Sequence, residues 1–170
     1  LFNRNINKLI LPGVGSFDRA MILLRKNGWI EKIDKFKADP NNKILGICLG
    51  MQLFFKSSQE GELPGLGWID GKVKKFSFSN DSLKVPHMGW NTVSPTKNSV
   101  LLPKDNREKR FYFVHSYYVG CNNLEDVMAK CTYGIEFTCA VNKNNIYGVQ
   151  FHPEKSHRFG FAFMKNFISL

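Results

Sequence analysis

Several features that would place a chain of 170 residues in a membrane, a secreted disulfide scaffold or a metalloprotein are missing from this sequence. No apolar stretch approaches the roughly 20 residues that a membrane-spanning helix requires. The first five residues are not followed by the apolar core of a signal peptide. The four cysteines and four histidines show neither C-x-x-C spacing nor a metal-ligand pattern. We therefore expect a protein of the reducing cytoplasm, with no membrane contact and no bound metal.

The net charge of +10 is large, but the lysines that produce most of it are scattered along the chain. No run of basic residues is longer than two, and no nucleic-acid-binding motif accompanies them. Many asparagines lie among the lysines, which indicates a general compositional bias. The sequence thus predicts no nucleic-acid partner.

With 43% hydrophobic residues, the chain is long enough to form one domain with a substantial core. An apolar run at residues 8–11 predicts a buried strand, and a helix then begins at Ser16 and ends near Gly28. A second short helix ends at Pro40, and another strand leads into Gly46. This strand–helix–strand–helix order predicts an α/β fold with a parallel sheet.

The rest of the chain mixes short alternating runs with glycines and prolines. This texture predicts antiparallel strands at residues 71–76, 90–93 and 111–115. A last strand at 146–151 delivers His152 at its end. An amphipathic helix, marked by regularly spaced phenylalanines, closes the chain.

The segment Gly-Ile-Cys-Leu-Gly at residues 46–50 has the pattern of a nucleophile elbow. A strand that turns through Gly-x-Cys-x-Gly directly into a helix presents its central side chain, here Cys48, to a substrate. Because a helix N-terminus favours thiolate over thiol, we expect a lowered pKa for Cys48. Downstream, His152 and Glu154 supply a base and a carboxylate that orients it. Together these residues predict acyl transfer by a cysteine nucleophile.

Acyl transfer also requires hydrogen-bond donors for an oxyanion. The backbone N–H of Leu49, directly after the nucleophile, is one such donor. Val14, between Gly13 and Gly15 in a turn that leaves the neighbouring strand, could supply a second. Taken singly, each feature has a structural explanation: a lone cysteine is usually a small buried hydrophobe, and a glycine-rich turn simply joins a strand to a helix. Their combination favours catalysis.

Five ordered motifs carry a resemblance to known proteins. Pro-Gly-Val-Gly-Ser-Phe (12–17), Gly-Ile-Cys-Leu-Gly-Met-Gln (46–52) and Phe-His-Pro-Glu-Lys-Ser (151–156) resemble the class I, triad-type glutamine amidotransferases. Val-Pro-His-Met-Gly-Trp-Asn (85–91) and Phe-Val-His-Ser-Tyr (113–117) are similar to segments of the glutaminase subunits of imidazole glycerol phosphate synthases. The resemblance extends over nearly the whole chain.

This resemblance implies a flavodoxin-like, mostly parallel sheet with helices on both faces and an additional antiparallel section. It implies hydrolysis of L-glutamine through a γ-glutamyl thioester, without a cofactor. It also implies a heterodimer in which the ammonia passes to a cyclase partner of (βα)8-barrel form, in histidine biosynthesis. The family opens with a further strand, loop and helix that this chain lacks, so we expect an N-terminally truncated domain.

The resemblance also assigns residues. Cys48 is the nucleophile, His152 the base and Glu154 the group that orients the base. Three positions match those that hold the α-amino and carboxylate groups of glutamine: Gln52, Ser116 and Tyr117. Two positions match those at the face that meets the barrel: Trp90 and Lys155.

Three other interpretations compete with this one. A paralogous glutaminase that supplies ammonia for amino-sugar or surface-polysaccharide synthesis would need the same motifs. A non-catalytic domain could keep the fold without the activity. A thiol hydrolase of the α/β-hydrolase type also uses the elbow, but it orders its triad nucleophile, acid, histidine, whereas here the acid follows the histidine.

Overall fold

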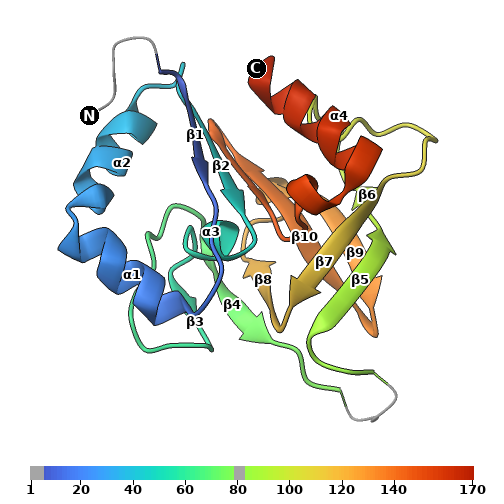
Figure 1. The fold of residues 1–170 in the computed structure, drawn as a ribbon, viewed down its shortest axis with the longest axis horizontal. Coiled ribbons are helices and arrows are strands. Elements are labelled where there is room, and N and C mark those ends of the chain that lie inside the picture. Colours follow the sequence, from blue (N-terminus) through green and yellow to red (C-terminus); the bar gives the residue numbers. More distant parts are fainter. Residues whose placement is uncertain (1–5, 79–82) are drawn as a thin grey trace.

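The computed structural model describes residues 6–78 and 83–170 (Figure 1). Residues 1–5, on which part of the signal-peptide argument rests, lie outside the described residues, as do residues 79–82. The chain begins with alternating strands and helices, in the order that its apolar patterning predicts. These elements are β1 (Lys8–Leu11), α1 (Phe17–Lys26), α2 (Trp29–Ala38), β2 (Lys43–Ile47) and the short α3 (Leu49–Gln52).

Local sequence explains where the first two helices begin and end. Ser16 occupies the N-cap of α1 and Asp18 lies in its first turn, where a carboxylate favours the helix dipole. Gly28 separates α1 from α2 with a left-handed φ of 62°, a conformation that glycine adopts without steric cost. Asp39 is the C-cap of α2, directly before Pro40. The predicted helices are therefore confirmed.

The middle and the end of the chain consist mainly of strands, followed by one long helix. The elements, in chain order, are β3 (Ser57–Ser58), β4 (Gly71–Lys75), β5 (His87–Thr92), β6 (Ser94–Pro95), β7 (Arg110–His115), β8 (Tyr117–Cys121), η1 (Leu124–Asp126), β9 (Val127–Tyr133), β10 (Ile135–Lys143), β11 (Ile146–Val149), η2 (Pro153–Lys155) and α4 (His157–Ile168).

The parallel strands β1, β2 and β11 position the site. Strand β2 lies between the other two, and Ile44 pairs with Leu9 on one side and with Ile146 on the other. The carboxyl ends of parallel strands meet at one edge of a sheet. The turn after β1, Cys48 after β2 and His152 beyond β11 therefore converge at that edge.

Two hydrophobic cores lie on opposite faces of these strands. Ile44 belongs to the core that α1 and α2 cover, and the next residue, Leu45, belongs to the core that α4 covers. Figure 1 shows α1 and α2 on one side of the sheet and α4 on the other. Phe17 and Phe163, one in each core, are at most 1% exposed. Burial of a side chain of this kind contributes roughly 1.5–3 kcal/mol to stability.

The α/β class with helices on both faces is confirmed, but the expectation of a mostly parallel sheet needs correction. Among the described strands of the large sheet, parallel pairs join β1–β2, β2–β11 and β3–β4, whereas β10–β11, β10–β8, β10–β9, β4–β8 and β6–β9 pair antiparallel. The reason is that the second half of the chain returns through tight turns instead of crossover helices. Gly134, with a φ of 69°, makes such a turn between β9 and β10.

The last strand is shorter than the sequence predicts, because β11 ends at Val149 and not at Phe151. Beyond it, the Gln150 N–H donates to the Cys139 carbonyl at 2.8 Å, and the His152 N–H donates to the Tyr112 carbonyl at 2.9 Å. Tyr112 lies on β7, which pairs with β5 in a separate two-stranded sheet. The segment therefore crosses from the large sheet to the small one, and this crossing places His152 beside the end of β2.

Candidate active site

The predicted nucleophile elbow has the backbone geometry that its sequence indicates. Cys48 has φ 54° and ψ −111°, a strained conformation for a residue with a β-carbon. The ends of the turn are fixed, because the Cys48 N–H donates to the Val149 carbonyl at 2.8 Å and the Cys48 carbonyl accepts from the N–H groups of Met51 and Gln52. These hydrogen bonds hold the strained turn in place, with the free thiol of Cys48 at the edge of the sheet.

The two glycines of the elbow permit close packing around it. A β-carbon on Gly46 would lie 2.6 Å from the ring of Phe54, and one on Gly50 would lie 1.8 Å from the backbone oxygen of Leu11. Gly50 therefore lets the start of α3 lie against the end of β1. This contact sets the position of the turn at residues 12–15 relative to the nucleophile.

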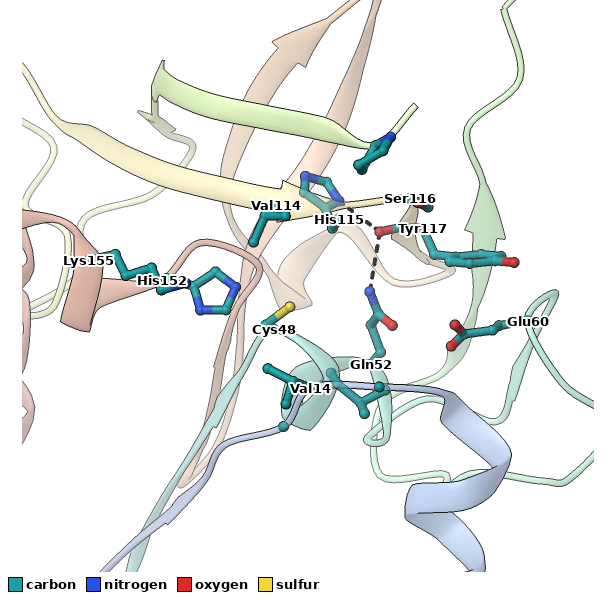
Figure 2. A pocket seen from close by; sticks show the side chains of 14 residues that line it. Val14, Cys48, Gln52, Glu60, Val114, His115, Ser116, Tyr117, His152 and Lys155 are labelled. Carbon is teal, nitrogen blue, oxygen red and sulfur yellow. Dashed lines mark hydrogen bonds between the residues drawn. The ribbon is translucent and has the colours of Figure 1, made fainter. Parts of the chain in front are cut away.

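His152 and Glu154 interact as the motif predicts. The Nδ1 of His152 lies 2.7 Å from Oε1 of Glu154. Because a carboxylate accepts hydrogen bonds, Nδ1 carries the proton and Nε2 is the basic nitrogen. His152 is 4% exposed, and its Nε2 has no hydrogen-bond partner among the described residues. Figure 2 shows the ring beside the Cys48 sulfur. The ring is therefore placed to take a proton from the thiol.

The backbone around His152 is fixed by contacts that the sequence motifs did not indicate. The fully buried Ser156 donates its hydroxyl to the His152 carbonyl at 2.6 Å and accepts the Tyr112 N–H at 3.0 Å. Gly160 of α4 lies against η2, where a β-carbon would meet the Pro153 carbonyl oxygen at 1.8 Å. A buried serine four residues after the histidine, followed by a glycine in a helix, is the pattern that could have indicated this contact.

The expected lowering of the Cys48 pKa is wrong for the resting site. Burial raises the pKa of the Cys48 thiol to about 11, and the hydrogen bonds from the Leu49 backbone and the Gln150 side chain offset only part of that effect. The helix that follows the elbow has only four residues, so its dipole is weak. Cys48 is therefore a thiol at neutral pH, and the thiolate forms only when a base removes its proton.

The predicted oxyanion donors lie at the pocket. The Leu49 N–H is directed toward the Cys48 sulfur, and Leu49 and Val14 both line the cavity in front of it. A β-carbon on Gly13 would lie 3.0 Å from the β-carbon of Leu49, so the turn packs directly on the elbow. Val14 is 88% exposed, and no hydrogen bond of the described residues uses its N–H. Gly15, with a φ of 102°, gives the turn its backbone conformation.

A pocket of about 350 Å³ brings together most of the residues predicted for the site. Figure 2 shows it between the elbow, the ends of β7 and β8, and His152. Glu154 is not among the lining residues, and its carboxylate contacts the Nδ1 of the His152 ring. The lining residues are Gly13, Val14, Gly15, Cys48, Leu49, Gln52, Glu60, Pro86, Val114, His115, Ser116, Tyr117, His152 and Lys155.

The side chain of Gln52 is held in one orientation. Its Nε2 donates to the Tyr117 carbonyl at 3.2 Å and to Oε1 of Gln150 at 3.0 Å. Both amide protons are thereby used, and the Gln52 Oε1 remains as an acceptor facing the pocket. Gln150 in turn places its own Nε2 3.6 Å from the Cys48 sulfur. Gln150 lies directly before the motif at residues 151–156, and nothing in the sequence pattern indicated a role for it.

Glu60 is a site residue that the sequence motifs did not indicate. Its carboxylate lines the pocket, and Oε2 accepts the Phe17 N–H at the start of α1 at 2.9 Å. A single glutamate in the Ser-Ser-Gln-Glu-Gly segment after the elbow carries no distinctive spacing. The carboxylate nevertheless provides the pocket with a negative charge opposite Gln52 (Figure 2).

Trp90 and Lys155 lie close together on the surface beside the pocket. Trp90 is 40% exposed and stacks on His157, with ring centroids 5.5 Å apart. The Lys155 ammonium lies 5.8 Å from the ring centroid of Tyr112, which packs at a steep angle against the ring of Trp90. The exposure of Trp90 leaves its ring accessible at this surface.

The described residues contain neither a metal cluster nor a membrane span. No group of three or more histidine, cysteine, aspartate or glutamate side chains among them is arranged to hold a metal ion. No helix among residues 6–78 and 83–170 is long and apolar enough to cross a membrane.

The cysteine–histidine–glutamate geometry and the fold define a class of protein that comparison with known sequences identifies. The chain belongs to the class-I glutamine amidotransferase family, whose sequence profile matches residues 4–169. It is 50% identical to the imidazole glycerol phosphate synthase subunit HisH of Leptospira borgpetersenii, over 98% of this chain and 83% of that protein. It is 52% identical to the subunit HisH 2 of Methanococcus maripaludis, over 95% of this chain and 79% of that protein.

A solved structure supports the fold independently. The chain matches the crystal structure of a glutamine amidotransferase with a TM-score of 0.68 and 18% identity, over 96% of this chain and 80% of that chain. At this identity, the similarity concerns the fold alone. The resemblance that the five sequence motifs indicated is therefore confirmed at the level of both family and fold.

Proposed function

We propose that this chain is the glutaminase subunit of an imidazole glycerol phosphate synthase. In this role it hydrolyses L-glutamine and passes the ammonia to a cyclase subunit in histidine biosynthesis. The observation that carries the proposal is the placement of Cys48 and the Glu154-oriented His152 around one pocket. The identity of about 50% with HisH subunits supports the particular pathway.

The first chemical step follows from the protonation states. His152 Nε2 takes the proton of the Cys48 thiol as the sulfur attacks the carboxamide carbon of glutamine. The negative charge that develops on the amide oxygen is stabilised by the Leu49 N–H and, when its peptide faces the pocket, by the Val14 N–H. Because burial raises the pKa of the Cys48 thiol to about 11, His152 must remove this proton for the sulfur to attack.

The second part of the reaction releases the two products. The imidazolium of His152 returns its proton to the leaving nitrogen, which departs as ammonia, and a γ-glutamyl thioester remains on Cys48. Water then gives a proton to His152 and attacks the thioester carbon. The carbon–sulfur bond breaks, glutamate leaves, and the proton on His152 returns to the sulfur. Glu154 stabilises the charged ring at both steps.

The pocket offers complementary groups for the amino-acid end of glutamine. The α-ammonium fits between the Glu60 carboxylate and the Gln52 Oε1, which both offer acceptors to the pocket. The α-carboxylate is assigned to the backbone of Ser116 and Tyr117. That backbone is rigid, because the Ser116 carbonyl accepts the Phe76 N–H at 3.0 Å and the Tyr117 carbonyl accepts two further bonds.

The partner face is assigned to the surface beside the pocket that carries Trp90 and Lys155. Met88, on the same strand as Trp90, is 62% exposed and adds apolar area to this surface. A cyclase of (βα)8-barrel form that docks here would cover the pocket opening and receive ammonia without loss to solvent. Docking would also orient the exposed Val14 peptide so that its N–H faces the pocket. Because loss of one oxyanion donor lowers a rate by about 10²–10³-fold, this change would control the glutaminase activity.

The test uses the full chain assembled with its cyclase subunit. Release of glutamate from amide-¹⁵N-glutamine and incorporation of the label into imidazole glycerol phosphate are measured for the parent and for Cys48→Ala. We expect Cys48→Ala to lose both signals and to retain product formation from free ammonium. Glutamine-dependent product formation by Cys48→Ala would overturn the assignment of the nucleophile. A complex that makes a different aminated product would overturn the pathway.

A further inference from the structure

Two buried histidines next to the pocket have no part in the reaction described above. His87 on β5 and His115 on β7 are direct cross-strand partners and are 2% and 5% exposed. His87 Nδ1 lies 2.9 Å from His115 Nε2. A pair of touching imidazoles in a core would cost stability unless each nitrogen had a matched partner.

The contacts of His115 fix its tautomer. Its Nδ1 lies 2.8 Å from the Tyr117 backbone oxygen, which can only accept a hydrogen bond, so Nδ1 carries the proton. Burial lowers the pKa of His115 to about 3, so the ring is neutral at pH 7. Its Nε2 is therefore an acceptor, and the hydrogen between the two rings must belong to His87 Nδ1.

The same reasoning applies one step further from the pocket. Burial lowers the pKa of His87 to about 4, so His87 is neutral and its Nε2 is an acceptor. The side-chain amide of Asn91 lies 3.2 Å from that nitrogen and supplies the donor. Asn91 also donates to the Thr132 carbonyl at 2.9 Å and accepts the Thr92 N–H at 2.8 Å, so its orientation is itself fixed.

The hydrogen bonds thus run in one direction, from Asn91 through His87 and His115 to the Tyr117 carbonyl. There they meet the Gln52 amide, which donates to the same oxygen. Figure 2 shows this meeting point, with the bonds of His115 and Gln52 ending on Tyr117. From Gln52 the bonds continue through Gln150 to the Cys48 sulfur.

We propose that His87 and His115 are positioning residues whose Nδ1–H tautomers set the Tyr117 carbonyl and the Gln52 amide for binding of the substrate's amino-acid end. The proposal rests on the proposed function, because glutamine is the ligand concerned. Packing accounts for an aromatic ring at position 87, which lies 4.8 Å from the ring of Phe113 and 4.1 Å from that of Tyr133. Packing does not explain why each ring nitrogen of His87 and His115 contacts a partner with the complementary donor or acceptor role.

The first test examines the tautomers and requires no turnover. Long-range ¹H–¹⁵N spectra of the full chain at pH 7 distinguish Nδ1–H, Nε2–H and doubly protonated rings. We expect His87 and His115 to be neutral Nδ1–H tautomers. An Nε2–H tautomer or an imidazolium at either position would overturn the proposal. Because this result does not depend on substrate, it separates the proposal from the proposed glutaminase activity.

The second test measures glutamine kinetics of the complex with its cyclase for two variants of His87. His87→Phe keeps the ring stacking but removes both nitrogens. We expect KM for glutamine to rise about tenfold, the effect of losing one hydrogen bond that orders the site, with a smaller change in kcat. His87→Asn places an N–H near the former Nδ1, so we expect KM to return to within about twofold of the parent.

The matched control is Tyr133→Phe, at a residue whose ring stacks on that of His87. It removes the hydroxyl that donates to the Lys84 carbonyl at 2.7 Å and leaves the hydrogen bonds of His87 intact. We expect its KM to be unchanged. An unchanged KM for His87→Phe, or an equal effect of Tyr133→Phe, would show that position 87 serves packing alone. If His87→Phe does not fold, the tautomer spectra decide the question.

Discussion

The backbone oxygen of Leu11 lies so close to Gly50 that a β-carbon on this glycine would be 1.8 Å from it. The end of β1 and the start of α3 are thereby held together, and both proposed oxyanion donors, the N–H groups of Leu49 and Val14, depend on this contact. The elbow and the oxyanion turn act as one unit because there is no side chain between them.

Substitution of Gly50 by alanine should push the elbow and the turn after β1 apart. We expect Gly50→Ala to lower the free energy of unfolding by about 1–3 kcal/mol, the usual cost of overpacking. Glutaminase activity should fall at least about tenfold, since a displaced turn loses part of an oxyanion donor. Urea unfolding and glutamate release provide the measurements. Gly120→Ala is the control, because its β-carbon meets the flexible Lys74 side chain, at 3.3 Å. Equal behaviour of the two variants would contradict the prediction.

The roles of His152 and Glu154 predict an order of damage. His152→Asn removes the base, whereas Glu154→Gln keeps an acceptor for Nδ1–H and removes only the charge that stabilises the imidazolium. We expect the loss of thioester formation to be roughly tenfold to a hundredfold larger for His152→Asn. Rapid-quench measurement of the acyl-enzyme gives both rates. Greater damage from Glu154→Gln would mean that the two roles are exchanged.

The strained backbone of Cys48 predicts a stability gain from an inactive variant. Glycine adopts a φ of 54° without steric cost, and strain of this kind costs on the order of 1–3 kcal/mol. We expect Cys48→Gly to be about 1 kcal/mol more stable than Cys48→Ala in denaturant unfolding, with no activity in either. Asn144→Gly is the control: its φ is 53°, but asparagine tolerates this region, so its gain should be smaller. Cys48→Gly no more stable than Cys48→Ala would count against strain at the elbow.

Glu60 should contribute to substrate binding through its charge. Glu60→Gln keeps an oxygen that can accept the Phe17 N–H, so the start of α1 should remain intact. We expect KM for glutamine to rise on the order of tenfold to a hundredfold, the range for a lost charged hydrogen bond, with little change in melting temperature. Glu62→Gln, at an exposed position two residues away, is the control. A normal KM for Glu60→Gln would remove this residue from the substrate site.

The buried histidine pair predicts how stability changes with pH. Burial lowers the pKa values of His87 and His115 to about 4 and about 3, below the value of 6.5 for a free histidine. Between these values the unfolded chain binds more protons than the folded one, so acid favours unfolding. We expect melting temperature to fall as pH decreases from about 6.5 to 4, and to fall less steeply in His87→Asn. A parent and variant with identical pH profiles would contradict this interpretation.

The sequence predicted which residues meet at the candidate site better than it predicted their environment. Cys48, His152 and Glu154 lie in short motifs that are typical of a nucleophile and of a base with its orienting carboxylate. Their grouping could therefore be inferred from the sequence. Glu60 could not be found in this way, because its role depends on a loop that folds back to the start of α1. The Cys48 pKa was mispredicted because the motif shows the helix N-terminus but shows neither how short that helix is nor how deeply the sulfur is buried.

The sequence also predicted some parts of the fold better than others. Apolar runs such as residues 8–11 and 43–47 indicated the parallel strands, because buried strands have a distinctive composition. The extent of antiparallel pairing was underestimated, since pairing between β8, β9 and β10 depends on turns at residues such as Gly134. The end of β11 was also misplaced, because the crossing at Gln150 depends on partners on two different sheets.

The two cores on opposite faces of the sheet have a further consequence for how the protein loses activity on heating. Leu49, beside the nucleophile, is packed in the core of α1 and α2, whereas Phe151, beside the base, is packed in the core of α4. Cys48 itself packs against the core of α4, so the reacting sulfur and the backbone N–H of Leu49 are held by different cores. A small shift between the two cores would move this N–H away from the reacting atoms while both cores stayed folded. Activity should therefore be lost at a lower temperature than secondary structure. Loss of activity would show movement between the two cores before spectroscopy shows unfolding.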